Sequence, residues 1–576
     1  MTTLIQQLLE EQQDLTAVDR FSQLHAAGDL PAQQKYYSRL LPASPPAAGQ
    51  QYAFNVDLDK CSGCKACVTA CHNLNGLDEN EAWRDVGLLI GGTPELPIMQ
   101  HVTTACHHCV DPACACACPV DAYEKNPVTG IVKHLDDQCF GCQYCTLACP
   151  YDVPKYNADK GIVRKCDMCS DRLADGEAPA CVQACPHEAI AIQVVDVARS
   201  VAEVPGRPLV PSSPSSDFTV PTTTYSGGPP LSADLTAADL SHLSPQHAHW
   251  PLIIMLILTQ LSVGMFAVGL LVGLTPSDDA PQMPAMATAA ALVQGSLPAG
   301  GSGFTNPLST AVSLSPAAVH SAVALLLGLL ALGSSTCHLG RPQYAFRAII
   351  GLKHSWLSRE IVVFGAFSGA AVTYTGLTWL DIAPPWLVTA SGVATVITGL
   401  AGVACSVMIY VFTRRQFWNL SSTSARFLLT CPVLGVAGSW LTLTTFAAIA
   451  QHEDTRALAT TCGPWFATTL IIATLLKAFS EFRIFRHLQE PEPTQLKRSA
   501  LLMTTLLRPV TMLRFTSGLA GGILLPIMAV LAPATAPVQV MLFSLLFVSC
   551  FAGESAERFL FFTAVSPDRM PGGLQS

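Results

Sequence analysis

Four cysteine motifs between residues 61 and 185 carry the residues of this sequence best suited to chemistry. The first and third motifs follow the spacing x2-x2-x3, and proline follows the last cysteine of the second, third and fourth. Thiolates at this spacing bind bacterial ferredoxin clusters, where three cysteines of a motif hold one cluster and the fourth reaches a second. They predict four [4Fe–4S] clusters and the transfer of single electrons. The sixteen cysteines are Cys61, Cys64, Cys67, Cys71, Cys106, Cys109, Cys114, Cys118, Cys139, Cys142, Cys145, Cys149, Cys166, Cys169, Cys181 and Cys185.

Two positions bear on how these clusters are held. The second motif has four residues between Cys109 and Cys114 and contains an extra cysteine, Cys116, which is either an inert neighbour or an alternative ligand. The third motif keeps a cysteine at its second position, Cys142, where another residue would favour a three-iron cluster. The sequence therefore favours four irons at this motif and Cys116 as a neighbour.

Disulfides and zinc are the other uses of dense cysteines, and the pattern favours neither. Disulfide scaffolds are usually small secreted chains, whereas residues 1–50 are polar, with no apolar signal region and no twin arginine. Zinc sites use paired CxxC units, not runs of four cysteines that end in proline. A non-redox membrane scaffold that binds zinc remains the alternative of another class.

The composition predicts a membrane protein. Half of the 576 residues are hydrophobic, 13% are charged, and the mean hydropathy of +0.38 is too high for a soluble chain of this size. From Trp250 onward, apolar runs recur that are long enough to cross a bilayer. The net charge of −9 gives no reason to expect nucleic acid as a partner. The eight runs are roughly 250–274, 316–336, 360–380, 386–411, 426–450, 464–484, 513–533 and 537–561.

The predicted fold class is an α+β ferredoxin-like four-cluster domain followed by an all-α polytopic membrane domain of eight transmembrane helices. A polar N-terminal extension spans residues 1–50, and its stretch from Leu4 to Leu24 is either a helical arm or a loosely ordered terminus. The cluster domain spans 51–198. A linker rich in Pro, Ser and Thr spans 199–248 and is expected to be extended and mobile. The membrane anchor spans 249–576.

The charges of the connecting segments predict the orientation. Segments after the odd-numbered spans carry few basic residues, whereas those after the even-numbered spans are basic. Basic loops face the cytoplasm. The cluster domain and the C-terminus are therefore expected on the cytoplasmic side of the inner membrane. The basic residues are Arg341, Arg347, Lys353, Arg359, Arg414, Arg415, Arg426, Lys497, Arg498, Arg508, Arg514 and Arg569.

Two regions resemble the subunits of one enzyme family. Region 51–198, with its four cysteine motifs, resembles the four-cluster ferredoxin subunit (DmsB-type) of the DMSO reductase family of molybdoenzymes. Region 247–572 resembles the eight-helix anchor subunit (DmsC-type), which is normally a separate chain. The segments that carry the second resemblance are His247-x-His249-Trp250-Pro251-Leu252, Cys337-His338-Leu339-Gly340-Arg341-Pro342, Ser355-Trp356-Leu357-Ser358-Arg359-Glu360-Ile361 and Gly553-Glu554-x3-Arg558.

The resemblance, rather than the spacing, implies which cysteines share a cluster. It pairs the first motif with the fourth and the second with the third. It also places the Cys61 cluster nearest a molybdenum subunit and the Cys118 cluster nearest the membrane. The implied sets are Cys61, Cys64, Cys67 and Cys185; Cys71, Cys166, Cys169 and Cys181; Cys106, Cys109, Cys114 and Cys149; and Cys118, Cys139, Cys142 and Cys145.

Few polar groups lie at the predicted spans, and two of them suit the oxidation of a quinol. His338 ends the second span and Glu360 opens the third, both on the cluster side. A quinol loses two protons with its two electrons, which a His and a carboxylate can accept, and the resemblance places the matching His at the quinol site. Helix capping is the alternative role for both residues.

Other polar residues in the spans have structural interpretations. Glu554 and Arg558 are four residues apart, as in an ion pair on one helix face. His320 and Gln260 are expected to make contacts between helices. Since no two histidines have a convincing spacing for axial ligands, we expect no haem.

The predicted function is that of an electron-transfer and anchor subunit. Quinol, with menaquinol favoured, is oxidised near His338 and Glu360, and the electrons pass through four clusters to a separate molybdopterin catalytic subunit. The chain is thus a quinol-oxidising redox subunit without the terminal catalytic site, in contact with membrane lipid and the quinone pool. The partner is expected to reduce nitrate or an S- or N-oxide. The reverse direction, from a dehydrogenase to quinone, is the alternative within this class.

Overall fold

The computed structural model describes residues 37–79, 81–203, 206, 208–227, 231–232, 234–273, 315–380, 383–531 and 535–572, together with 3–5, 23 and 26. The chain divides into two compact units. Unit 1 is Met1–His242 with Asp568–Ser576, and unit 2 is Leu243–Pro567. The predicted arm at Leu4–Leu24 and the loop 275–315 lie almost entirely outside the described residues.

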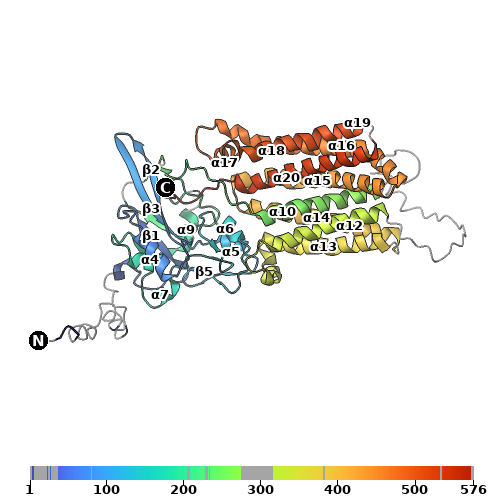
Figure 1. Ribbon diagram of the computed structural model, residues 1–576. Helices are drawn as coiled ribbons and strands as arrows, with labels where there is room; N and C mark the ends of the chain where they lie inside the picture. Colours follow the sequence, from blue (N-terminus) through green and yellow to red (C-terminus); the bar gives the residue numbers. More distant parts are fainter. Residues whose placement is uncertain are drawn as a thin grey trace. The chain divides into compact units, whose positions relative to one another are not determined.

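Unit 1 is built from short strands and short helices, and several of the helices carry cysteines of the motifs (Figure 1). This confirms the predicted ferredoxin-like α+β region. Its strands are β1 (Gln50–Asp57), β2 (Asp85–Thr93), β3 (Leu96–Thr104), β4 (Tyr123–Lys125), β5 (Val132–His134), β6 (Lys155–Asn157), β7 (Ile162–Arg164), β8 (Ile190–Asp196), β9 (Thr224–Ser226) and β10 (Thr236–Ala237). Its helices are the 3-10 turn η1 (Ser38–Leu40) and α4 (Ala66–Leu74), α5 (Ala113–Ala117), α6 (Tyr144–Ala148), α7 (Ser170–Ala174), α8 (Ala180–Gln183) and α9 (Val197–Glu203).

The strands before and after the four motifs pair with each other. β1 runs antiparallel to β8, with Phe54 opposite Ile192. Both side chains are buried in the core of the unit. This pairing closes the region that carries the sixteen cysteines, because its two ends are held side by side.

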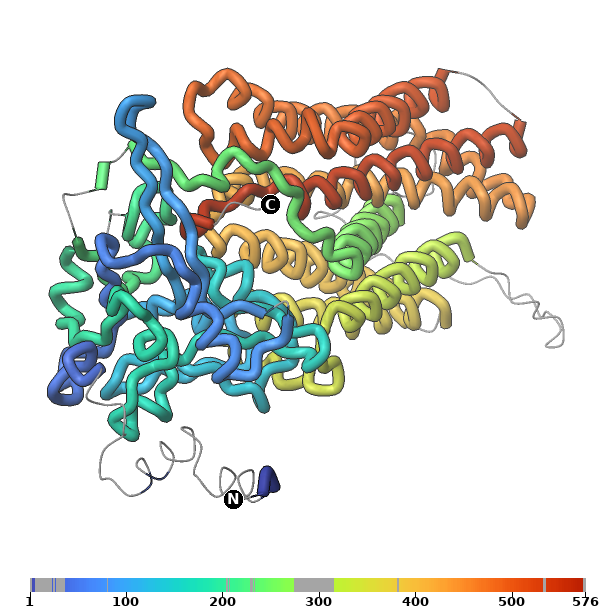
Figure 2. Tube along the Cα trace, turned by 60° about the vertical axis from the view of Figure 1, so that its left-hand side comes forward, coloured from blue at the N-terminus to red at the C-terminus, as the bar shows by residue number. Residues whose placement is uncertain are grey.

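Strands β2 and β3 form a regular antiparallel hairpin, with Asp85 opposite Thr104 at its base and Thr93 opposite Leu96 at its tip. Figure 2 shows it as a long two-stranded arm. Apolar side chains near the tip, among them Leu96 and Met99, are exposed. The base of the hairpin leads directly into the second cysteine motif.

Residues 199–242 differ from the expected mobile linker. β9 adds to β1 as a parallel strand, and β10 adds to β2 as an antiparallel strand. Between these strands and α9, Thr222 accepts a hydrogen bond from Gln51 at 3.2 Å. This stretch is rich in Pro, Ser and Thr and lacks apolar periodicity. It is nevertheless ordered, because its backbone pairs with the edges of the two sheets and its hydroxyl groups make hydrogen bonds.

The C-terminal segment returns to unit 1. Leu88 N–H donates to the Gly572 carbonyl at 3.1 Å. Arg569 pairs with Asp239 at 2.6 Å, and the Gly572 N–H donates to the same carboxylate at 3.2 Å. The close approach requires a glycine at position 87, because a side chain there would collide with the Pro571 carbonyl.

Unit 2 consists of long apolar helices. Among its described residues, eight helices are long and apolar enough to cross a membrane, which confirms the predicted number. They are formed by α10 (Trp250–Gly273), α12 (Pro316–Thr336), α13 (Trp356–Leu380), α14 (Pro385–Phe412), α15 (Leu420–Ile449), α16 (Glu453–Phe482) with η4 (Arg483–Gln489), α18 (Arg508–Leu519) with the π-helical turn η5 (Ala520–Leu524) and α19 (Leu525–Leu531), and α20 (Ala536–Thr563). Shorter connecting helices are η2 (Pro342–Lys353), η3 (Gln416–Trp418) and α17 (Gln495–Thr504).

The helices pack as two adjoining groups (Figure 1). One group contains α10, α12, α13 and α14, and the other contains α15, α16, α18 with α19, and α20. Helix α10 joins the groups, because it also packs along α15. Two close approaches of glycine allow this contact, since a Cβ atom on Gly264 or Gly435 would meet the backbone of the other helix.

Several helices begin earlier than the apolar runs. The third starts at Trp356, so Glu360 lies one turn inside the helix rather than at its first residue. The sixth starts at Glu453, well before the apolar run at 464. The first turns of these helices contain polar residues. The start of an apolar run therefore does not mark the start of the helix.

Candidate functional site

The first and third cysteine motifs have the same backbone conformation. Gly63 and Gly141 both have φ near 74°, and the residues two positions later, Lys65 and Gln143, have φ of 61° and 60°. A helix starts directly after each: α4 and α6 place Cys67 and Cys145 in their first turns. The left-handed residues turn the chain sharply, so that cysteines close in sequence face one space.

A second repeated feature follows the last cysteines of three motifs. Each is followed by proline and then, three residues after the cysteine, by an acidic residue at positive φ: Asp121, Asp152 and Glu188. At the second and fourth motifs, the next backbone N–H donates to the cysteine sulfur at 3.3 Å. The motifs are thus internal repeats in structure as well as in spacing.

The structure brings the first and fourth motifs together. Burial raises the pKa of Cys61, and the nearby thiols of Cys185 and Cys64 raise it further. Burial raises the pKa of Cys71 to about 12, and the Cys181 and Cys169 thiols contribute. Thiols act on each other in this way only at short range. Cys185 therefore lies beside the first motif, and Cys71 lies beside the fourth.

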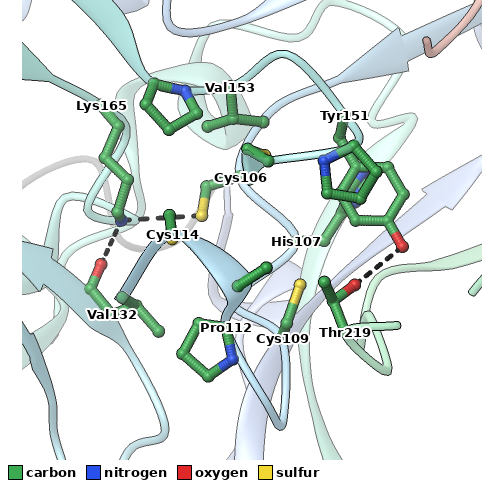
Figure 3. Close-up of a pocket in the computed structure, with 14 residues that line it drawn as sticks. Cys106, His107, Cys109, Pro112, Cys114, Val132, Tyr151, Val153, Lys165 and Thr219 are labelled. Carbon is green, nitrogen blue, oxygen red and sulfur yellow. Dashed lines mark hydrogen bonds between the residues drawn. The ribbon is translucent and has the colours of Figure 1, made fainter. Parts of the chain in front are cut away.

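The second and third motifs also come together. Burial raises the pKa of Cys149 to about 12, and Cys106 adds to the effect. Burial raises the pKa of Cys118 to about 11, with backbone hydrogen bonds opposing and the Cys139 thiol contributing. Figure 3 shows the cavity that Cys106, Cys109 and Cys114 line, and Cys149 lines it too. Three thiols of the second motif and one of the third thus face one space.

The donor set fits iron–sulfur clusters better than single metal ions. All 22 cysteines are free thiols. Among the described residues, no three His, Cys, Asp or Glu side chains converge closely enough to hold one metal ion. A four-iron cluster is larger than a zinc ion, so its thiolates stand farther apart. Buried thiols with raised pKa values also need positive charge to ionise, which bound iron supplies.

Close neighbours link cysteines of different motifs, twice from thiol to thiol and once through a tyrosine hydroxyl. Cys67 lies near Cys181, and Cys166 lies near Cys106. The Tyr123 hydroxyl lies within electrostatic range of both Cys145 and Cys114. These contacts lead from the first motif to the fourth, from the fourth to the second, and from the second to the third.

Two buried cations stand among these groups, and sequence analysis did not find them. Arg84 is 3% exposed, and the Cys181, Cys67 and Cys166 thiols act on its guanidinium. Lys165 is 2% exposed, with Nζ 3.6 Å from the Cys106 sulfur. Lys165 directly precedes Cys166 in the sequence, and this position could have indicated that it lies near the cysteines. Nothing in the sequence connects Arg84 with a motif.

Cys116 is placed apart from the groups. Its Sγ atom lies 3.6 Å from an oxygen of Asp111, and the helix α5 that carries it directs Cys114 into the cavity of Figure 3. Burial, and after it the neighbouring Asp111 carboxylate, raise the pKa of the half-buried Cys116 thiol.

In unit 2, His338 belongs to a group of histidines. It directly follows Cys337, the C-cap of α12, and its ring lies 5.1 Å from that of His249. The His247 ring lies 5.0 Å from the His249 ring. Burial, with the neighbouring imidazoles of His338 and His247, lowers the pKa of His249 to about 4. The His249 imidazole is therefore uncharged at neutral pH.

Glu360 is buried inside α13. Its side chain accepts a hydrogen bond from the Ser406 hydroxyl of α14, and it is 6% exposed. A carboxyl group that bonds a neighbouring helix is not an N-cap. The alternative role of Glu360 as a helix cap is therefore wrong.

The expected ion pair between Glu554 and Arg558 is also wrong. Glu554 pairs instead with Lys477 and with Arg514, the latter at 2.9 Å. Arg558 donates to Gln260 at 2.9 Å. The two residues share a helix face, but partners on other helices compete successfully for both charges. Gln260 and His320 do make contacts between helices, the latter with Ser439 at 2.9 Å.

Comparisons with known proteins agree with this architecture. Residues 98–195 match the family model of a 4Fe-4S dicluster domain, and residues 310–564 match that of the DMSO reductase anchor subunit, DmsC. Over 157 residues, the sequence is 34% identical to the B subunit of anaerobic dimethyl sulfoxide reductase of Escherichia coli K12, covering 26% of this protein and 76% of the relative.

Two relatives belong to other systems. The sequence is 37% identical over 145 residues to the thiosulfate reductase electron transfer subunit PhsB of Salmonella typhi, covering 24% of this protein and 74% of the relative. It is 32% identical over 189 residues to the hydrogenase-2 operon protein HybA of Escherichia coli O157:H7, covering 28% and 56%. These matches fall on an iron–sulfur electron-transfer region, whereas the second half is an integral membrane anchor. The protein therefore belongs to the family of the B subunits of anaerobic dimethyl sulfoxide reductases, fused in one polypeptide to a DmsC-type anchor.

Proposed function

We propose that this chain oxidises quinol in unit 2 and conducts the electrons through four [4Fe–4S] clusters in unit 1 to a separate molybdopterin catalytic subunit. The observation that carries the proposal is the gathering of sixteen cysteines near one another within one unit of a chain whose other unit is a membrane anchor. When bound, the clusters supply one-electron transfer.

The neighbour relations of the thiols support four ligand sets. Each set takes three cysteines from one motif and one from its partner motif. Arg84 and Lys165 would offset the negative charge of the thiolates around them. We assign Cys61, Cys64, Cys67 and Cys185 to the first set; Cys71, Cys166, Cys169 and Cys181 to the second; Cys106, Cys109, Cys114 and Cys149 to the third; and Cys118, Cys139, Cys142 and Cys145 to the fourth.

Exposure supports the first set as the point where electrons leave. Cys64 is exposed and Cys61 is half-buried, whereas Cys118, Cys139 and Cys145 of the fourth set are buried. A partner can approach a cluster at the surface closely. The catalytic subunit thus docks at the Cys61 set, in our proposal, and its substrate is an oxyanion or an S- or N-oxide.

We assign His338 and Glu360 to quinol oxidation, with His249 supporting His338 through the ring contact. A neutral imidazole and a carboxylate can each take one of the two quinol protons. Menaquinol is the favoured donor. Glu360 is held in place by Ser406, which would fix the direction of its oxygens.

The cluster unit lies on the cytoplasmic side in our proposal. The basic connections of the even-numbered spans support this side, and the chain both enters and leaves unit 2 from residues of unit 1. Alkaline phosphatase fused after Ser576 is expected to be inactive in cells. An active fusion would contradict the orientation.

Membrane vesicles that contain the chain test the function directly. With a reduced quinol analogue and a dye as electron acceptor, we expect quinol oxidation at a rate proportional to the iron content. A His338→Gln variant with full iron content is expected to lose this activity. Ready quinone reduction without quinol oxidation would favour the reverse direction, and a chain that contains zinc without iron would favour the scaffold alternative.

A further inference from the structure

Thr103 lies buried beside the first cysteine motif, and the proposed function does not use its hydroxyl group. It is the next-to-last residue of β3, where it stands opposite Val86 of β2, and it is 1% exposed. Its Oγ1 atom lies 3.6 Å from the Cys67 sulfur. A residue 36 positions away in the sequence thus places a hydroxyl group at an expected cluster ligand.

Arg84 fixes the direction of this hydroxyl group. Its Nη1 atom donates to the Thr103 Oγ1 atom at 3.1 Å, so the guanidinium occupies a lone pair of that oxygen. Among the described residues, the hydroxyl hydrogen of Thr103 has one acceptor, the Cys67 sulfur. A cysteine that binds iron is a thiolate, which accepts hydrogen bonds and donates none. Thr103 is therefore the donor and Cys67 the acceptor.

Packing holds Arg84 and Thr103 in these positions. The Arg84 guanidinium lies over the buried Phe54 ring of β1, 4.7 Å from its centroid. The Tyr225 hydroxyl of β9 donates to the Thr103 carbonyl at 3.2 Å. The hydrogen bond to Cys67 is thus oriented by parts of three strands, and its geometry does not depend on a mobile side chain.

Arg84 and Thr103 differ in the number of thiols that they affect. The guanidinium of Arg84 lies near thiols of the first and fourth motifs, among them Cys67 and Cys181. In the proposed assignment, Cys67 belongs to the first set and Cys181 to the second. The Thr103 hydroxyl reaches Cys67. The charge therefore acts on both sets, whereas the hydroxyl group acts on the first.

A hydrogen bond to a ligand sulfur raises the reduction potential of the cluster that the sulfur holds. It withdraws negative charge from the thiolate, and the reduced state, which carries one more negative charge, gains more from this than the oxidised state. Transfer of one electron from the second set to the first forms no bond, breaks none and moves no proton. Its equilibrium depends on the difference between the two potentials.

We propose that Thr103, oriented by Arg84, is a positioning residue that acts through Cys67 and favours transfer of the electron from the second set to the first; this inference rests on the proposed function. Cys64 of the first set is exposed, so this set is the one that a catalytic subunit can approach. A higher potential there increases the fraction of electrons that stand where the partner accepts them.

Two substitutions of Thr103 test the proposal in the purified full-length protein. Thr103→Val removes the hydroxyl group and nearly keeps the shape of the side chain, and Thr103→Ser keeps the hydroxyl group. In redox titrations followed by electron paramagnetic resonance, we expect Thr103→Val to decrease the equilibrium constant for reduction of the first set about tenfold, which is a potential lower by about 59 mV. Thr103→Ser is expected to keep the potential of the wild type. The signal of the first set is identified by its change in Cys64→Ser.

Two further variants separate the hydrogen bond from other causes. Thr69 is exposed on α4, and its hydroxyl donates to the Lys65 carbonyl at 3.4 Å. Thr69→Val makes the same chemical change near the same motif and is expected to leave all potentials unchanged. Arg84→Gln removes the charge near both sets and is expected to lower both of their potentials.

The outcomes distinguish this inference from the proposed function. A wild-type potential of the first set in Thr103→Val with full iron content would overturn the inference and leave the proposed function standing. An equal fall in Thr103→Ser would also overturn it, because the hydroxyl group would then not be the cause. Thr103→Ala gives the same comparison if the valine variant loses iron. A wild-type protein without iron–sulfur clusters would overturn the proposed function, and this inference with it.

Discussion

Lys165 Nζ lies 3.6 Å from the Cys106 sulfur in the interior of unit 1. The ammonium also donates to the carbonyl oxygen of Cys166 at 2.8 Å, so one side chain contacts residues of the second and fourth motifs. A fixed positive charge at this place stabilises the reduced state of any cluster held by these thiolates.

Removal of this charge should make the neighbouring clusters harder to reduce. For Lys165→Met we expect a reduction potential lower by on the order of 200 mV, since one charge 3.6 Å away is worth about 4–5 kcal/mol at an effective dielectric constant near 20. A redox titration followed by electron paramagnetic resonance measures it. Lys160→Met, which removes an exposed lysine, should leave all potentials unchanged, and equal potentials in both variants would contradict the role of Lys165.

Cys114 and Cys116 should differ sharply when each is replaced by serine. Cys114 lines the cavity with Cys106, Cys109 and Cys149, so Cys114→Ser should lose a cluster or convert it to a three-iron form. Cys116 faces Asp111, and Cys116→Ser should keep the iron content of the wild type. Iron and acid-labile sulfide are measured on purified protein, with about sixteen of each expected for four clusters. If only Cys116→Ser lost iron, Cys116 would be the ligand and Cys114 the neighbour.

His249 should make the protein less stable at mildly acidic pH. Its pKa falls to about 4 in the folded chain from about 6.5 in the unfolded chain. The unfolded state thus binds more protons between these values, and stability is lost as the pH drops from about 6.5 toward 4. We expect the unfolding temperature to fall less from pH 7.5 to 5.5 in His249→Gln than in the wild type. An equal fall would show that His249 takes up its proton equally in both states.

The C-terminal segment should loosen when Asp239 is replaced. Asp239→Ala removes the partner of Arg569 and of the Gly572 N–H. The loss of one charged pair and one hydrogen bond should cost about 1–3 kcal/mol, and limited proteolysis should release the segment sooner. Asp234→Ala removes a carboxylate whose hydrogen bond with Ser232 stays within its own turn and serves as the control. Equal proteolysis of both variants would contradict the role of Asp239.

The cysteine motifs and the eight spans could be predicted because each is a local pattern. Ligand spacing is fixed within a dozen residues, and a bilayer span is a run of apolar residues. The strand after the last motif was likewise predictable from Ala189 to Val195, and it forms β8. These features do not depend on what the rest of the chain does.

The remaining features depend on partners distant in sequence. Arg84 lies among thiols of the first and fourth motifs. No local sequence pattern predicts this position, because it depends on how distant segments pack. The pairing of Glu554 with Arg514 rather than Arg558 is decided by which helix packs against α20. Strands β9 and β10 of the segment 199–242 pair with sheet edges. This pairing uses backbone groups, so the side-chain pattern of the sequence does not predict it.

The return of residues 568–572 to unit 1 has a consequence for biosynthesis. These residues leave the ribosome only after all eight spans, so the site at Gly87 and Asp239 is filled last. The cofactor-bearing part of the protein therefore cannot reach its final packing until the hydrophobic part has been translated. A chain that stalls before residue 568 would leave the site at Asp239 unfilled.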